Sequence, residues 1–131
     1  MLCGGAVSWR SKKQASVALS SAEAEYMALA AAAQECVWQQ GLMDALDEQC
    51  SQTQIFTDSQ SAIAMANNPK FHGRAKHVDI KYHFVRQLVL KGTIALKYCP
   101  TDEMVADVLT KSLDKLKHQK FCCLMNLQNM F

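Results

Sequence analysis

Three short carboxylate motifs contain the residues of this chain that could do chemistry. Acids occur within residues 21–26, 55–62 and 105–111, each time at the edge of an apolar segment. If folding brings these segments together, their oxygens form a site for a hard divalent cation, because the cation offsets the repulsion between the carboxylates. A fourth acid of the kind such sites use is expected further upstream, but residues 1–22 contain no Asp or Glu.

The first motif lies at the start of a predicted helix. Ser20 is a good N-cap, and Glu23 stands at the third helical position, which together make a capping box. Glu25 has no such structural role and lies one turn before Leu29, close to the apolar face. Glu25 is therefore the candidate ligand, and the alternative is a surface acid stabilised by the helix dipole.

The other two acids belong to different kinds of element. Asp58 follows a predicted buried strand at residues 55–57, and ligand sites gather at the carboxyl ends of strands in open α/β sheets. The alternative for Asp58 is a simple helix N-cap. Asp107 lies beside the apolar stripe of a predicted helix, so it needs a metal or a basic neighbour such as Lys111.

The elements that must position these acids follow from apolar periodicity. Alternation with a period of two predicts strands, and spacings of three and four predict helices, with Gly41 ending or bending the first helix. The order β-α-β-α-α-β-α-α predicts an α/β layer fold in one domain, residues 1–131. The predicted strands are residues 6–9, 55–57 and 93–99. The predicted helices are residues 21–41 with a second helical stretch at 42–48, then residues 60–67, 77–90, 100–112 and 115–128.

Composition excludes several classes of protein. Half of the 131 residues are hydrophobic and a fifth are charged, which is typical of a globular domain and not of a disordered chain. No apolar run approaches the ~20 residues that span a bilayer, and the first residues lack the pattern of a secretion signal. The six cysteines form no C-x-x-C pair, so we expect reduced thiols in an intracellular protein.

Charge is strongly segregated although the net charge is only +2. Residues 21–69 carry seven acids and no Lys or Arg, whereas residues 70–97 carry seven bases against Asp79. An acidic centre beside basic segments suits a metal site next to a polyanion, and the alternative is a solvated helix face. The spacing of His72, His77 and His83 matches no common zinc pattern, which favours a phosphate- or base-contacting surface there.

Five stretches in order carry a resemblance that covers the chain from about Gly4 to Leu124. These stretches are residues 7–14, 17–26, 57–62, 76–84 and 106–111. Through them the chain resembles the ribonuclease H domain at the C-terminus of the Pol polyprotein of copia-type LTR retrotransposons.

The resemblance implies a three-layer α/β fold, with a mixed sheet flanked by helices, that hydrolyses the RNA strand of RNA–DNA hybrids. It implies catalytic and metal-binding roles for Glu25, Asp58 and Asp107 around two Mg²⁺ (or Mn²⁺) ions. It also implies partnership with the reverse transcriptase portion of the same polyprotein, in a cytoplasmic virus-like particle. The candidate contacts to the hybrid backbone are Lys12, Lys13, Arg74, Lys76, His77 and Lys81.

The chain departs from the family pattern in two places. The family's first catalytic aspartate and the first one or two strands have no match, so we expect a domain incomplete at its N-terminus, with impaired catalysis. The late-loop histidine of many ribonucleases H has no match in residues 99–103. The alternatives are a non-catalytic nucleic-acid-binding remnant and an integrase-like recombinase, although integrases end on a glutamate and lack the Leu-Thr-Lys signature.

Overall fold

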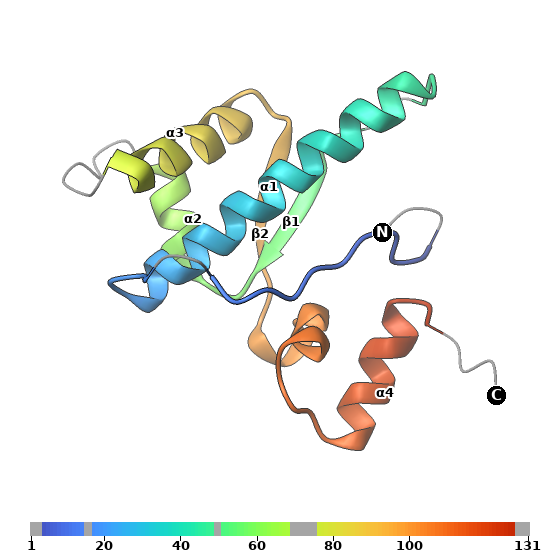
Figure 1. Cartoon of the computed structure of the whole chain (residues 1–131). Helices are drawn as coiled ribbons and strands as arrows, with labels where there is room; N and C mark the ends of the chain where they lie inside the picture. Colours follow the sequence, from blue (N-terminus) through green and yellow to red (C-terminus); the bar gives the residue numbers. More distant parts are fainter. Residues whose placement is uncertain (1–3, 15–16, 49–50, 69–75, 128–131) are drawn as a thin grey trace. The chain divides into compact units, whose positions relative to one another are not determined.

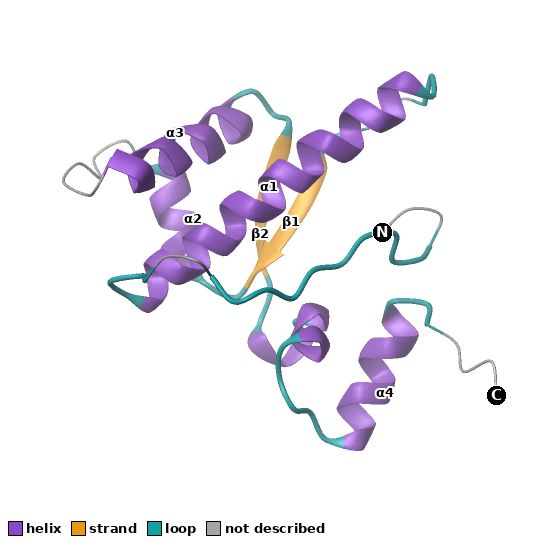
Figure 2. Cartoon of the chain, in the orientation of Figure 1, coloured by secondary structure: helices purple, strands orange, loops and turns teal. Residues whose placement is uncertain are grey.

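The computed structural model describes residues 4–14, 17–48, 51–68 and 76–127, with the backbone alone for residues 76–79. The chain forms two compact units, residues 18–101 and residues 1–17 together with 102–131, and Figure 1 and Figure 2 show the elements of each. In chain order the elements are α1 (Ser21–Ala45), β1 (Thr53–Thr57), α2 (Gln60–Asn67), α3 (Lys76–Leu90), β2 (Ile94–Tyr98), the 3₁₀ segments η1 (Thr101–Glu103) and η2 (Val105–Leu109), and α4 (Lys115–Leu124).

The unit of residues 18–101 is built on a small parallel sheet. β1 pairs with β2 in a register that sets Thr53 opposite Ile94 and Thr57 opposite Tyr98. Parallel strands need a long crossover, and α2 and α3 provide it. The predicted α/β class is confirmed. The predicted mixed sheet is wrong for the described residues, where the sheet has two strands and both run in the same direction.

The predicted strand at residues 6–9 does not form. This segment has no regular structure, and the backbone N–H of Ala6 donates a hydrogen bond to the carbonyl of Met125 at 3.3 Å. Trp9 is 69% exposed, so the alternating apolar side chains have no surface to pack on. Alternation produces a strand only where a neighbouring strand completes its hydrogen bonds.

The core lies between the sheet and α1, α2 and α3 (Figure 2). Ala33 and Ala62 are fully buried, and such small side chains let α1 and α2 approach closely. Ile55 of β1 points into this core, whereas its neighbour Phe56 points the other way and is 54% exposed. The core residues are Tyr26, Leu29, Ala30, Ala33, Ile55, Ala62, Met65, Ala66, Tyr82, Val85 and Ile94.

A pair of stacked tyrosines joins α1 to α3. The rings of Tyr26 and Tyr82 lie 4.1 Å apart at 18°. The Tyr26 hydroxyl donates to the carbonyl of Tyr82 at 3.3 Å, and the Tyr82 hydroxyl donates to the sulfur of Met65 at 3.5 Å. Both buried hydroxyls are therefore satisfied, which removes the penalty of burying a polar group.

α1 continues through Gly41, so the predicted break there is wrong. The residues around Gly41 are good helix formers, and one interior glycine costs only about 1 kcal/mol. Gln40 also fixes this part of α1 to the sheet. Its side-chain amide donates to Thr53 Oγ1 at 2.8 Å and to the carbonyl of Thr93 at 3.0 Å.

The C-terminal segment differs most from its prediction. Residues 100–112 form two short 3₁₀ segments instead of one helix, because Met104 between them is extended. α4 begins where predicted, since Asp114 caps it by accepting from the N–H groups of Leu116 and Lys117 at 3.0 Å each. It ends at Leu124, earlier than the predicted residue 128.

Candidate active-site carboxylates

Glu23 has the structural role predicted for it. The Ser20 hydroxyl oxygen accepts from the N–H of Glu23 at 3.2 Å, which confirms Ser20 as the N-cap of α1. The Glu23 carboxylate in turn accepts from the N–H of Leu19 at 2.9 Å, and Glu23 is only 3% exposed. The reciprocal bond therefore reaches one residue further back than in the usual capping box.

Glu25 differs from Glu23 in being exposed. The Gln40 bonds place the later part of α1 beside the start of both strands, so α1 runs opposite to β1 and β2. From Gln40 back to Glu25 the helix is about 22 Å long, and from Thr53 to Asp58 the strand extends about 17 Å. The start of α1 and the carboxyl end of β1 therefore lie toward the same end of this unit (Figure 1), and Glu25 and Asp58 belong to these two places in the chain.

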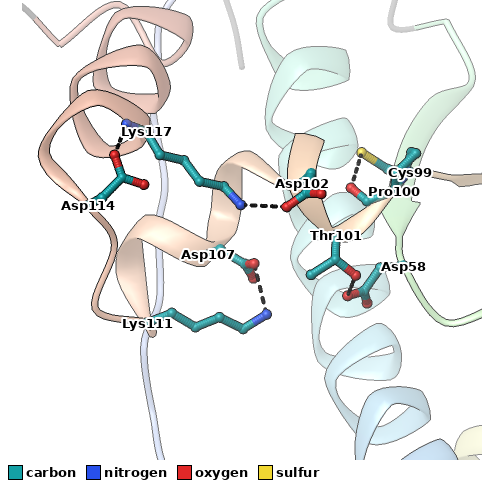
Figure 3. A network of polar contacts seen from close by, with 9 residues as sticks. All are labelled: Asp58, Cys99, Pro100, Thr101, Asp102, Asp107, Lys111, Asp114 and Lys117. Atoms are coloured by element: carbon teal, nitrogen blue, oxygen red, sulfur yellow. Dashed lines mark hydrogen bonds and ion pairs between the residues drawn. The ribbon is translucent and has the colours of Figure 1, made fainter.

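Asp58 follows β1 directly but does not cap α2. The cap is Ser59, whose hydroxyl oxygen accepts from the N–H of Ala62 at 3.2 Å. The N-cap alternative for Asp58 is therefore wrong. Instead, the Thr101 hydroxyl donates to Asp58 Oδ2 at 3.0 Å (Figure 3).

Thr101 is the site residue that sequence reasoning misses. It follows β2, the neighbouring parallel strand, just as Asp58 follows β1. The carboxyl ends of parallel strands meet at one edge of a sheet. The available signal was that a polar residue stands shortly after each of two predicted strands. That signal predicts a contact only if the two strands are known to pair in parallel.

Asp107 is held by the basic neighbour predicted for it. It is only 7% exposed, and Lys111 Nζ lies 2.8 Å from its Oδ2 (Figure 3). The Lys111 side chain is 49% exposed and that of Asp107 is 10% exposed, so Lys111 reaches a nearly buried carboxylate from the solvent side. A cation that replaces Lys111 would have to offset the same buried negative charge.

The same unit holds a second, more exposed ion pair. Lys117 Nζ lies 3.0 Å from Asp102 Oδ1 (Figure 3). This hydrogen bond, helped by the positive charge of Lys117, lowers the pKa of the Asp102 carboxyl. Lys117 also lies over the ring of Phe121, 5.6 Å from its centroid. These contacts order the start of α4 and leave Asp102 as a surface acid.

The three predicted ligands are divided between the two units. Glu25 and Asp58 belong to residues 18–101, and Asp107 belongs to the other unit. In the described ranges no three His, Cys, Asp or Glu side chains form a group that could hold a metal ion. The oxygen donors suit Mg²⁺ or Mn²⁺ by type, and their convergence stays a prediction.

The predicted nucleic-acid surface is described only in part. Lys12 and Lys13 are exposed in a segment without regular structure, and Lys81 is partly exposed on α3. Lys76 and His77 are the first two residues of α3, and the structure describes their backbone but not their side chains. Of the basic loop predicted at residues 71–76, Arg74 and the rest of residues 71–75 fall outside the described residues, so the surface stays a prediction.

Comparison with known proteins gives long matches to retrotransposon polyproteins. The chain is 38% identical over 116 residues to the Retrovirus-related Pol polyprotein from transposon TNT 1-94 of Nicotiana tabacum, covering 88% of the chain and 9% of that polyprotein. It is 39% identical over 116 residues to the Retrovirus-related Pol polyprotein from transposon RE2 of Arabidopsis thaliana, covering 88% of the chain and 8% of that polyprotein. The chain thus spans less than a tenth of either relative.

A shorter match has higher identity. The chain is 73% identical over 37 residues to Secreted RxLR effector protein 161 of Plasmopara viticola. The match covers 28% of this chain and 26% of that protein. No protein-family model matches the chain, and no solved structure matches it.

Fold and site together define an α/β domain with an aspartate at the carboxyl end of a parallel strand. Similarity at this level over 88% of the chain indicates common descent. The chain is therefore homologous to a short region of retrotransposon Pol polyproteins. None of the helices in the described ranges is both long and apolar enough to cross a membrane.

Proposed function

We propose that this chain is a ribonuclease H-type domain of a copia-type retrotransposon Pol polyprotein, which hydrolyses the RNA strand of RNA–DNA hybrids. The observation that carries the proposal is the position of Asp58 at the carboxyl end of β1, with Glu25 toward the same end, in a chain homologous to Pol. Paired acids at the end of a parallel strand are a common way to hold a catalytic cation.

In this proposal each acid has a separate role. Asp58 binds the cation through the oxygen that Thr101 leaves open, and the Thr101 hydroxyl fixes the rotation of its carboxylate. Glu25 supplies a further oxygen from α1, and Asp107 supplies another once it leaves Lys111. Mg²⁺ or Mn²⁺, when bound, supplies the positive charge that lowers the pKa of water and stabilises a leaving oxygen.

The proposed substrate contacts are electrostatic. Lys12, Lys13 and Lys81 would grip the phosphate backbone, together with Arg74 and the start of α3 at Lys76 and His77. Hybrid recognition would depend on the shape of the duplex and on the 2′-hydroxyls of the RNA strand, with little sequence preference. The reverse transcriptase portion of the same polyprotein is the proposed partner.

A second candidate function is non-catalytic nucleic-acid binding. It is favoured by the ion pair that engages Asp107 and by the lack of any Asp or Glu in residues 1–22. Without a fourth acid the cation is held by fewer oxygens, and its affinity falls. Binding to the hybrid would then remain while hydrolysis would not.

The test is Mg²⁺-dependent cleavage of an RNA–DNA hybrid by the 131-residue chain and by a chain extended with its native upstream sequence. Glu25→Gln should lower the rate at least about 100-fold, since even changes beyond the ligand shell cost 10–100-fold. Asp58→Asn should do the same, although its amide oxygen can still accept from Thr101. Glu23→Gln is the matched control, because a capping box accepts Gln and the rate should stay unchanged.

The possible results separate the two candidates. A Glu25→Gln variant as active as the unmodified chain would refute the proposed ligand set. If both the 131-residue chain and the extended chain bind the hybrid but cleave nothing in Mg²⁺ or Mn²⁺, the non-catalytic function is correct. If the extended chain is active and the 131-residue chain is not, the fourth acid lies upstream of residue 1.

A further inference from the structure

The C-terminal half of α1 has an apolar face that the described core does not cover. The buried face of α1, from Tyr26 to Ala33, belongs to its N-terminal half. Beyond it the helix projects past the start of β1 (Figure 1). In this half of the helix and just after it, Trp38 is 62% exposed and Leu46 is 63% exposed. We call this surface the α1 patch, and its members are Val37, Trp38, Gly41, Leu42 and Leu46.

The members of the α1 patch lie on one side of the helix. Trp38, Leu42 and Leu46 are four residues apart, and this spacing aligns side chains along one helix face. From Val37 to Leu46 the patch is about 14 Å long, close to three turns of a second helix. Single exposed apolar side chains are ordinary, but a row that includes a tryptophan marks an interaction surface.

Gly41 lies within this row and gives the patch its shape. A Cβ added at Gly41 would meet nothing within 4 Å, so no contact inside the described chain requires a glycine there. An interior glycine nevertheless costs the helix about 1 kcal/mol relative to alanine. Between Trp38 and Leu42 it leaves a shallow hollow where the backbone of another helix can approach closely.

The surroundings of the α1 patch are acidic. Glu35, Asp44, Asp47 and Glu48 lie around it, and residues 21–69 contain no Lys or Arg. Two copies of this surface would repel each other, and an anionic lipid surface would be repelled as well. A helix with an apolar stripe between basic side chains complements both the apolar row and the charge.

We propose that the α1 patch is a docking site for a basic amphipathic helix of another protein. The apolar stripe of that helix packs against Trp38 and Leu42 with its backbone over Gly41. Its Lys or Arg side chains then face the acids that flank the patch. This interaction is separate from hydrolysis, since Glu25 and Asp58 are at the opposite end of α1 from the patch.

The test follows Trp38 fluorescence in the full chain. Trp9→Phe removes the other tryptophan, which is 69% exposed, so that all emission comes from Trp38. The probes are an amphipathic Leu/Lys helical peptide of about 15 residues and its Leu/Glu counterpart. The Leu/Lys peptide should shift the Trp38 emission to the blue with a saturable titration, and the Leu/Glu peptide should not.

Variants locate the binding to the patch. In the Trp9→Phe chain, Leu42→Ser should weaken binding of the Leu/Lys peptide about tenfold or more. Gly41→Gln should raise the thermal stability of the chain, because Gln favours helix, and yet weaken binding by filling the hollow. Leu116→Ser is the control, since Leu116 is an exposed leucine on α4, 78% exposed against 45% for Leu42, and should leave binding unchanged.

Charge is tested by Asp44→Asn, Asp47→Asn and Glu48→Gln together, which should weaken binding and reduce its dependence on salt. Asn is suitable at residue 47 because Asp47 has a positive φ of 57°. Four results would each overturn the proposal: a blue Trp38 emission in the free chain, no response to either peptide, equal responses to both peptides, or self-association of the chain that buries Trp38.

Discussion

At the level of single residues, two glutamates that stand two positions apart have different environments. Glu23 is buried and accepts from the N–H of Leu19, while Glu25 is exposed. This difference was predictable, because capping depends on positions within one turn of the chain. The Thr101 contact with Asp58 was not predictable in that way, since it joins residues 43 positions apart. Local chemistry is therefore readable from sequence, and contacts made by strand pairing are not.

Tyr26 provides a prediction about pH. Burial raises the pKa of the Tyr26 hydroxyl well above its ordinary value of about 10, and the neighbouring Tyr82 raises it further by a smaller amount. Above about pH 10 the unfolded chain releases this proton and the folded chain keeps it, so the free energy of unfolding falls as pH rises. Tyr26→Phe should lower the free energy of unfolding by about 1 kcal/mol near neutral pH, because it removes the hydrogen bond to the carbonyl of Tyr82. The free energy of unfolding of this variant should then fall less steeply at alkaline pH.

Urea unfolding between about pH 7 and about pH 11 measures this effect. Tyr98→Phe is the control, because Tyr98 is 49% exposed and its loss should leave the alkaline decline as it was. If Tyr26→Phe retains the full decline, the burial of Tyr26 does not control the alkaline stability of the chain.

At the level of elements, α2 shows where a local pattern is sufficient and two other segments show where it is not. α2 matches its predicted range of residues 60–67 because Ser59 caps it and Asn68 ends it. Residues 6–9 alternate as a strand does, yet no strand forms there, because pairing depends on a partner distant in sequence. Residues 100–112 have helical spacing, and the extended Met104 divides them into two 3₁₀ segments.

Two glycines make a matched pair for the next prediction. Gly92 ends α3 with a φ of +71°, and its N–H donates to the carbonyl of Val89 at 3.0 Å. Gly92→Ala should lower the free energy of unfolding by about 1–2 kcal/mol, because this backbone region is strained for any residue with a Cβ. Gly41→Ala should raise it by about 0.5–1 kcal/mol, since Gly41 is inside a helix with open space around it.

Thermal unfolding of both variants under identical conditions provides the comparison. The essential result is the opposite sign of the two changes, because the substitution is the same and only the backbone conformation differs. A destabilising Gly41→Ala substitution would mean that α1 does not continue as a regular helix through residue 41.

At the level of the whole molecule, acidic and basic side chains are segregated along the chain. The acids of residues 21–69 include the four around the α1 patch, and exposed lysines lie in the segment at residues 12–13 and on α4. This segregation is read directly from the sequence, since charge needs no pairing to be counted. Convergence of Asp107 with Asp58 depends on contacts between distant residues, which no local pattern encodes.

The last prediction concerns the salt dependence of hybrid binding, and it rests on the proposed function. Each lysine that neutralises a phosphate adds about 0.7–0.9 to the slope of log affinity against log salt concentration. Lys12→Gln with Lys13→Gln should therefore reduce the slope by about 1.5 and weaken binding to all hybrid sequences alike. Lys115→Gln with Lys120→Gln is the control, because it removes the same charge from exposed lysines of α4 that are outside the predicted contact set. Fluorescence anisotropy with a labelled hybrid across a range of salt concentrations measures both slopes. Equal losses in the two double variants would mean that net charge, and not a defined surface, holds the nucleic acid.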